Sequence, residues 1–129
     1  MKILVVDDAE QTLMRLKKLL EAKGYTVVTA RNADEAIAAA RKSKGLDLLI
    51  ADFHMPGLDG LTMFKAIRQL PNFASLPSIF LTTETTAEIK SASRKAGVKA
   101  WVVKPFNDES LLNLVQVVLR GNLSTVEAS

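Results

Sequence analysis

The chain has 129 residues, 48% of them hydrophobic, and a formal net charge of +3. This length fits one domain with a full core, and the absence of cysteine excludes disulfides, cysteine nucleophiles and cysteine-ligated metals. The basic residues are scattered rather than gathered in a stripe, and the start of the chain does not read as a signal peptide. The longest uncharged run, residues 69–83, is interrupted by two prolines and therefore does not predict a membrane-spanning helix. We therefore expect a soluble cytoplasmic protein that neither binds DNA nor enters a membrane.

Short apolar runs alternate with amphipathic segments along the chain. The apolar runs are too short for helices and predict strands at 3–6, 25–30, 48–51, 78–82 and 100–103. Apolar residues recur at helical spacing between them and predict helices at about 10–23, 34–42, 60–70, 86–96 and from 108 to 119. Five strand–helix units with short connections imply an α/β fold, a doubly wound parallel sheet with helices on both faces.

Two of the predicted helices have unusual apolar faces. The fourth, residues 86–96, has Ile89 as its one large apolar residue, so we expect it to be loosely held. In the last helix, Leu114 and Val117 fall outside the predicted buried stripe. They form either an exposed apolar strip for a partner or second copy, or a surface covered by the C-terminal tail. The residues leave this choice open.

Charged side chains stand where three of the predicted strands end. Asp52 follows the run 48–51, Asp7 and Asp8 follow the first run, and Lys104 follows the fifth. Taken singly, each reads as an ordinary strand-end or surface residue. Parallel strands, however, bring their C-terminal ends to one rim, where neighbouring carboxylates repel one another. A bound Mg²⁺ removes that conflict, and the set predicts a phosphoryl site with an aspartate nucleophile.

The same residues resemble those of the receiver domain of bacterial two-component response regulators, most closely the single-domain, CheY-like kind. The match runs from about residue 2 to residue 119, in the family's order and spacing, through Asp7-Asp8, Asp52, Met55-Pro56, Asp59-Gly60, Thr82 and Lys104-Pro105-Phe106. The resemblance implies a flavodoxin-like five-stranded sheet of order 2-1-3-4-5. It places the receiver domain at 1–120 and a C-terminal tail at 121–129.

The resemblance also implies roles for the residues at the rim. Asp52 is the expected phosphoacceptor. Asp8 and Asp52 are expected to ligate Mg²⁺ directly, with the main-chain carbonyl of His54 as a further ligand and Asp7 acting through water. Lys104 is expected to pair with the phosphoryl group, and the peptide bond after it is usually cis in receivers.

A switch and a rate-tuning pair follow from the same resemblance. The hydroxyl of Thr82 is expected to bond the new phosphoryl oxygen, and the ring of Trp101 to turn inward in response. This movement would change the surface formed by the fourth helix, fifth strand and fifth helix. His54 and Glu84 match positions that flank the path of the attacking water and tune how long the phosphoryl group lasts.

The expected function is that of a stand-alone response regulator that turns over no outside substrate. A sensor histidine kinase of the CheA-like kind would phosphorylate it, a phosphatase is a possible further partner, and the flagellar motor switch protein is the expected target. The stretches at 81–84 and 101–106 resemble chemotaxis regulators, whereas Ala9 departs from them. Alternatives are a phosphorelay intermediate that passes the group to a histidine phosphotransfer protein, and a non-phosphorylated scaffold. An aspartyl-phosphate phosphatase of the haloacid dehalogenase type is disfavoured, because His54 occupies the place of its second acid.

Overall fold

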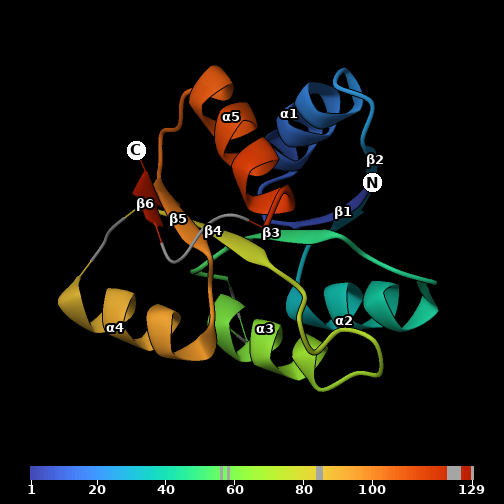
Figure 1. Ribbon diagram of the computed structural model, residues 1–129, viewed down its shortest axis with the longest axis vertical. Helices are drawn as coiled ribbons and strands as arrows, with labels where there is room; N and C mark the ends of the chain where they lie inside the picture. Colours follow the sequence, from blue (N-terminus) through green and yellow to red (C-terminus); the bar gives the residue numbers. More distant parts are fainter. Residues whose placement is uncertain (56, 58, 84–85, 122–125, 129) are drawn as a thin grey trace.

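A parallel β-sheet between two layers of helices forms the protein (Figure 1). The computed structural model describes residues 1–55, 57, 59–83, 86–121 and 126–128. Within these ranges the strands are β1 Lys2–Val6, β2 Thr26–Ala30, β3 Leu48–Asp52, β4 Ser78–Thr82, β5 Ala100–Val103 and β6 Val126–Ala128. Their order is β2-β1-β3-β4-β5-β6, and every neighbouring pair is parallel. The predicted α/β class and the 2-1-3-4-5 order are confirmed.

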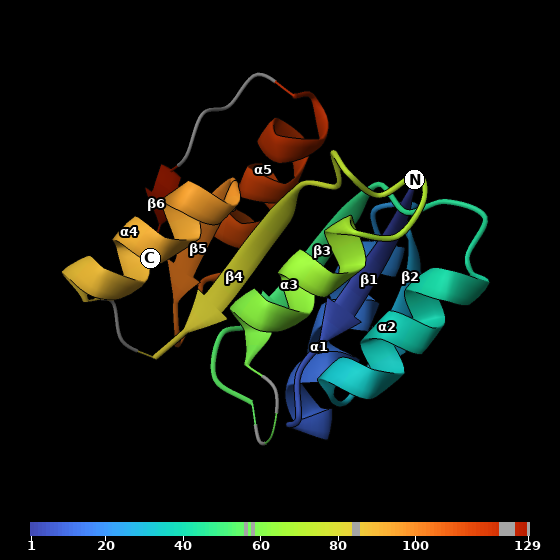
Figure 2. The ribbon, with the colours of Figure 1, turned by 90° about the horizontal axis from the view of Figure 1, so that it is seen from below.

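Helices cover both faces of the sheet, as predicted. They are α1 Glu10–Glu21, α2 Ala33–Lys42, α3 Gly60–Arg68, α4 Ala87–Ala96 and α5 Asp108–Leu119. Helices α1 and α5 lie on one face, and α2, α3 and α4 lie side by side on the other (Figures 1 and 2). The described helices are all too short or too polar to cross a membrane.

Side-chain caps set the start of four helices. Asn32, Asp59, Thr86 and Asn107 each accept a hydrogen bond from the main-chain N–H three residues later, which satisfies a donor that the helix itself leaves open. At the other end of α4, Gly97 has a φ of 90°, a left-handed conformation in which glycine avoids a steric penalty. These local signals explain why the observed ends lie close to the predicted ones.

The core consists of two apolar layers, one on each face of the central strands. Every residue of β3 and β4 is buried, as expected for parallel strands covered on both sides. Helix α1 contributes Leu13, Leu16 and Leu20 to one layer, and each such side chain contributes about 1.5–3 kcal/mol on burial. Among the residues of α4, Ser93 is the buried one. This helix therefore buries little, which agrees with its few large apolar residues, and its loose attachment stays a prediction.

Two features at the β5 side differ from the sequence expectations. Leu114 is 9% exposed and belongs to the core layer under α5, so the prediction that it falls outside the buried stripe is wrong, while Val117 is half-buried. The predicted tail contains a sixth strand, β6, which pairs with β5 over three residues. A three-residue strand has no periodicity of its own, and its pairing depends on the open edge of β5.

Candidate functional site

The C-terminal ends of β1, β3 and β5 bring three of the predicted site residues together. β1 and β3 are paired neighbours, so Asp7 and Asp52 stand side by side just beyond the pairing. Lys104 follows β5 and reaches back to both: its Nζ lies 2.9 Å from Oδ2 of Asp7 and 3.3 Å from Oδ2 of Asp52. Asp7 is fully buried and Asp52 is 8% exposed. The predicted convergence of carboxylates and an ammonium is present.

Main-chain donors hold the other oxygen of each buried carboxylate. Oδ1 of Asp7 accepts a hydrogen bond of 2.9 Å from the N–H of Ala9. Oδ1 of Asp52 accepts one of 3.1 Å from the N–H of His54. Each carboxylate is thus oriented by the backbone on one side and by Lys104 on the other, so both are held ready for a ligand at the rim.

The charges at this rim perturb one another. Burial raises the pKa of Asp52 above its ordinary value, and the charge of Asp7 adds to this, although Lys104 opposes it. Burial alone would lower the pKa of Lys104, but its hydrogen bond to Asp7 and the charges of Asp52 and Asp7 outweigh burial and raise it. Lys104 therefore stays protonated, and a further cation at the rim would favour the ionised form of Asp52.

Asp8 completes an acidic cluster with these residues. One oxygen each from Asp7, Asp8 and Asp52 lies within 4.8 Å of the others. Asp8 is exposed, so the cluster opens to solvent on its side. Oxygen ligands in a partly open site suit Mg²⁺, which keeps several waters and takes few carboxylates. The residues present fit the ion.

The start of α3 packs directly against the carbonyl of Asp52. A Cβ atom built on Gly60 would lie only 2.5 Å from that oxygen, so a larger residue does not fit here. The N–H of Gly60 donates to the carbonyl of Phe53 at 3.0 Å. Asp59 is exposed and caps α3 through the N–H of Thr62. The Asp59-Gly60 pair thus caps α3 and lets it pack against the backbone of Asp52, and it adds no side chain to the acidic cluster.

The predicted switch residues lie on β4 and β5. Thr82 is the last residue of β4 and is 1% exposed. Its carbonyl accepts a hydrogen bond of 2.7 Å from the N–H of Lys104. Trp101 is 3% exposed and belongs to the core layer under α3 and α4, with the guanidinium of Arg94 6.0 Å from its ring centre. Its ring points inward in this structure.

The residues predicted to tune the rate follow β3 and β4 in the sequence. His54 is exposed, and its ring meets the ring of Phe53 edge-on, with centroids 5.1 Å apart. Glu84 lies outside the described residues, as does Pro56 of the matching motif. The peptide bond between Lys104 and Pro105 is cis, as the resemblance implied.

Comparison with known proteins gives the family. A family model described as the response regulator receiver domain matches residues 3–116. The chain belongs to this family. Protein PilH of Pseudomonas aeruginosa is 35% identical over 123 residues, which cover 93% of this chain and 98% of PilH. Chemotaxis protein CheY1 of Helicobacter pylori is also 35% identical over 123 residues, covering 95% and 99% of the two chains.

Solved structures agree with the assignment to the receiver family. Chemotaxis protein CheY4 of Vibrio cholerae has a TM-score of 0.86 with 38% sequence identity, over 91% of this chain and 97% of that one. Receiver domains are signalling proteins of two-component systems that are phosphorylated and bind Mg²⁺ at an acidic pocket. In this chain, Asp7, Asp8 and Asp52 form an acidic cluster whose carboxylates could hold such an ion.

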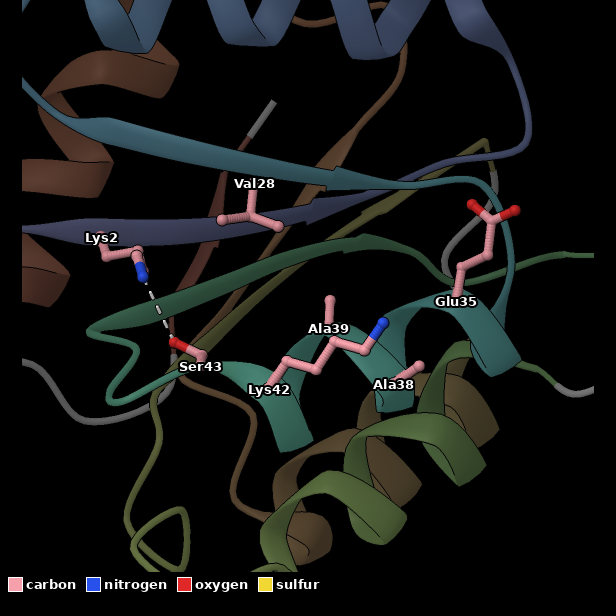
Figure 3. Close-up of a pocket in the computed structure, with 7 residues that line it drawn as sticks. All are labelled: Lys2, Val28, Glu35, Ala38, Ala39, Lys42 and Ser43. Atoms are coloured by element: carbon pink, nitrogen blue, oxygen red, sulfur yellow. Dashed lines mark hydrogen bonds between the residues drawn. The ribbon is translucent and has the colours of Figure 1, made fainter.

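A separate cavity lies away from this cluster and is lined by none of its residues. It measures about 460 Å³ and runs along α2, where Figure 3 shows the ammonium of Lys2 bonded to the hydroxyl of Ser43. Its other lining residues are Val28, Glu35, Ala38, Ala39 and Lys42. The lining mixes alanines and Val28 with scattered polar side chains, and it contains none of the residues of the acidic cluster.

One residue at the rim was not predicted from the sequence. Arg15 of α1 contacts the loop that follows Lys104, although more than 90 residues separate it from Phe106 and Asp108. Nothing in the local pattern of α1 distinguishes it from the other exposed basic residues of that helix. The signal exists only in the folded chain.

Proposed function

We propose that this receiver domain is a phosphorylation switch whose acceptor is Asp52. The observation that supports this most directly is the ammonium of Lys104 placed between Asp7 and Asp52 at the strand ends. Within this proposal, residues 1–120 form the receiver and 121–129 its tail, and the protein acts in the cytoplasm.

The acceptor chemistry follows from the positions of these side chains. An oxygen of Asp52 attacks the phosphorus of a phosphohistidine on a sensor histidine kinase; the new P–O bond forms as the P–N bond breaks, and the imidazole departs. Lys104 pairs with the transferred phosphoryl oxygens, while the N–H of His54 holds the other oxygen of Asp52. Asp8, Asp52 and the carbonyl of His54 would hold Mg²⁺, with Asp7 acting through water, and the bound ion would supply further charge neutralisation.

Return to the resting state is hydrolysis at the same position. Water attacks the phosphorus, the P–O bond to Asp52 breaks, and inorganic phosphate leaves. His54 and Glu84 flank the path of this water in the proposal, with or without the help of a phosphatase. No outside substrate is turned over, so the protein is not an enzyme in the ordinary sense.

The output is a change in the surface of α4, β5 and α5. Thr82 would turn its hydroxyl to the new phosphoryl oxygen, and Trp101 would be held inward beside it. Helix α4 is anchored shallowly, so a small free-energy change at the rim suffices to shift it. Because relatives such as CheY1 are named as chemotaxis proteins, we propose a CheA-like kinase as donor and the flagellar motor switch protein as target.

The first experiment measures the intact mass after incubation with acetyl phosphate, with and without Mg²⁺. We expect one phosphoryl adduct that requires Mg²⁺ and is absent in Asp52→Asn. Asp34→Asn is the matched control, because Asp34 is an exposed carboxylate in the first turn of α2. An adduct retained in Asp52→Asn, or none in the wild type, contradicts the proposal and favours the scaffold alternative.

A second experiment separates the two possible outputs of a phosphorylated receiver. The phosphorylated protein is mixed either with a flagellar motor switch protein or with a histidine phosphotransfer protein. Binding of the first without loss of the phosphoryl group supports the chemotaxis output. Rapid movement of the phosphoryl group to a histidine of the second supports the phosphorelay alternative.

A further inference from the structure

The loop between β5 and α5 carries the ammonium of the site and is held at both ends. At its start, the N–H of Lys104 donates to the carbonyl of Thr82 at 2.7 Å. At its end, the side chain of Asn107 caps α5 through the N–H of Ser110. Between these ends, Phe106 is 7% exposed and packs into the core layer beneath α1 and α5.

Arg15 contacts Phe106 in the loop in two ways and Asp108 at the start of α5 in a third. One terminal nitrogen of its guanidinium donates to the carbonyl of Phe106 at 3.2 Å. The guanidinium carbon lies 4.2 Å from the centre of the Phe106 ring, within the range of a cation–π contact. Its Nε donates to Oδ1 of Asp108 at 2.9 Å, and a terminal nitrogen contacts the same oxygen. One planar group thus joins α1 to the loop and to the first residue of α5.

A cavity beside the loop increases the importance of these contacts. It measures about 350 Å³ and is lined by Thr12, Arg15, Thr83, Lys104, Pro105 and Phe106. Phe106 packs into the core, but on this side the loop after Lys104 borders open space, so directed contacts add to packing in defining its position. Arg15 provides directed contacts there.

The contacts of Arg15 differ from those of another exposed arginine, Arg31. Arg31 pairs with Glu35 at 3.5 Å, four residues along the chain. Such a pair on the surface contributes little to stability. Arg15 and Asp108 are also about half-exposed, so their ion pair alone is expected to contribute little. The backbone carbonyl and the ring of Phe106 are the contacts that tie Arg15 to the loop.

We propose that Arg15 is a positioning residue, which holds the loop after β5 so that Nζ of Lys104 stays between Asp7 and Asp52. It touches neither the acceptor nor the phosphoryl group. Its effect on phosphorylation rests on the proposed function, whereas its effect on the ammonium does not. A lysine at this position keeps the charge but cannot reproduce the planar fork or the stacked geometry.

The decisive measurement is the mobility of the Lys104 ammonium, followed by ¹⁵N NMR of lysine side chains without Mg²⁺ or phosphoryl donor. We expect a rigid ammonium in the wild type and in Arg31→Ala, and a more mobile or faster-exchanging one in both Arg15→Ala and Arg15→Lys. An ammonium equally rigid in Arg15→Ala and wild type overturns the proposal. So does equal loosening in Arg31→Ala, which would point to a general loss of order.

Kinetics provide the functional readout. Since a misplacement of 1 Å can cost about 100-fold in rate, a smaller displacement of Lys104 predicts a decrease of about three- to tenfold in the acetyl phosphate reaction of Arg15→Ala. Mg²⁺ affinity is not expected to fall, because Arg15 touches none of the carboxylates in the cluster and a looser Lys104 ammonium competes less with the ion for Asp7 and Asp52. A parallel loss of Mg²⁺ affinity and rate would indicate a merely structural role. A wild type that gains no adduct defeats the proposed function, but the NMR comparison still decides the role of Arg15.

Discussion

Replacing Gly60 by alanine tests how closely α3 approaches the acceptor. The added Cβ would lie 2.5 Å from the carbonyl oxygen of Asp52, 3.2 Å from Cα of Phe53 and 3.3 Å from its carbonyl oxygen. These are backbone atoms, which cannot rotate away as a flexible side chain can. The start of α3 must therefore withdraw by roughly 1 Å, which also stretches the hydrogen bond from the N–H of Gly60 to Phe53.

The free energy of unfolding should fall by about 1–2 kcal/mol in this variant. Overpacking of this kind costs about 1–3 kcal/mol, and the better helix propensity of alanine offsets at most about 1 kcal/mol. For a domain of this size the change corresponds to a decrease of roughly 4–8 °C in Tm. The rate of phosphorylation at Asp52 should fall as well, because the backbone that carries the acceptor is displaced.

Urea and thermal unfolding followed by circular dichroism measure the change, with Gly45→Ala as the matched control. A Cβ at Gly45 meets no atom within 4 Å, so that substitution should leave stability unchanged or raise it by up to about 1 kcal/mol. If Gly60→Ala is as stable as Gly45→Ala and is phosphorylated at the wild-type rate, the close approach of α3 does not constrain the acceptor and the reasoning is wrong.

Three further predictions concern charge, hydrolysis and helix anchoring. Burial and the charge of Asp7 raise the pKa of Asp52 above 3.8 despite Lys104. The native state therefore binds the proton more tightly than the unfolded state, and the free energy of unfolding falls as pH rises from 3.8 through the raised pKa. In urea unfolding without Mg²⁺, Asp52→Asn should be more stable than wild type at neutral pH, and its free energy of unfolding should depend less on pH. His54→Ala should change the phosphate-release rate of the phosphorylated protein without abolishing phosphorylation, and an unchanged lifetime would remove this residue from the hydrolysis step. Arg68 donates to a carbonyl in the loop after α3, at 2.8 Å, and to the last carbonyl of α4, at 3.0 Å. Arg68→Ala should lower the free energy of unfolding by about 1–2 kcal/mol and speed amide hydrogen exchange in α4. Unchanged exchange would show that other contacts anchor α4.

The sequence by itself determined the elements and most of the site. Caps such as Asn32 and Asp59 and the apolar spacing of α1 are local signals, and they act the same way wherever the helix lies. The meeting of Asp7, Asp52 and Lys104 was also predictable, because parallel strands put their C-terminal ends at one rim and each of these residues ends or follows a strand. Strand order, by contrast, was available only through resemblance to a known family.

Only the tertiary structure decided how the site is supported. Arg15 meets Phe106 and Asp108 across more than 90 residues of chain, and no local pattern encodes a contact over that distance. β6 likewise exists because the edge of β5 is open to pair with it. Periodicity and caps indicate the type and the ends of each segment, but not which other segments it contacts. A contact between distant segments depends on how the layers pack, because only the folded chain brings those segments together.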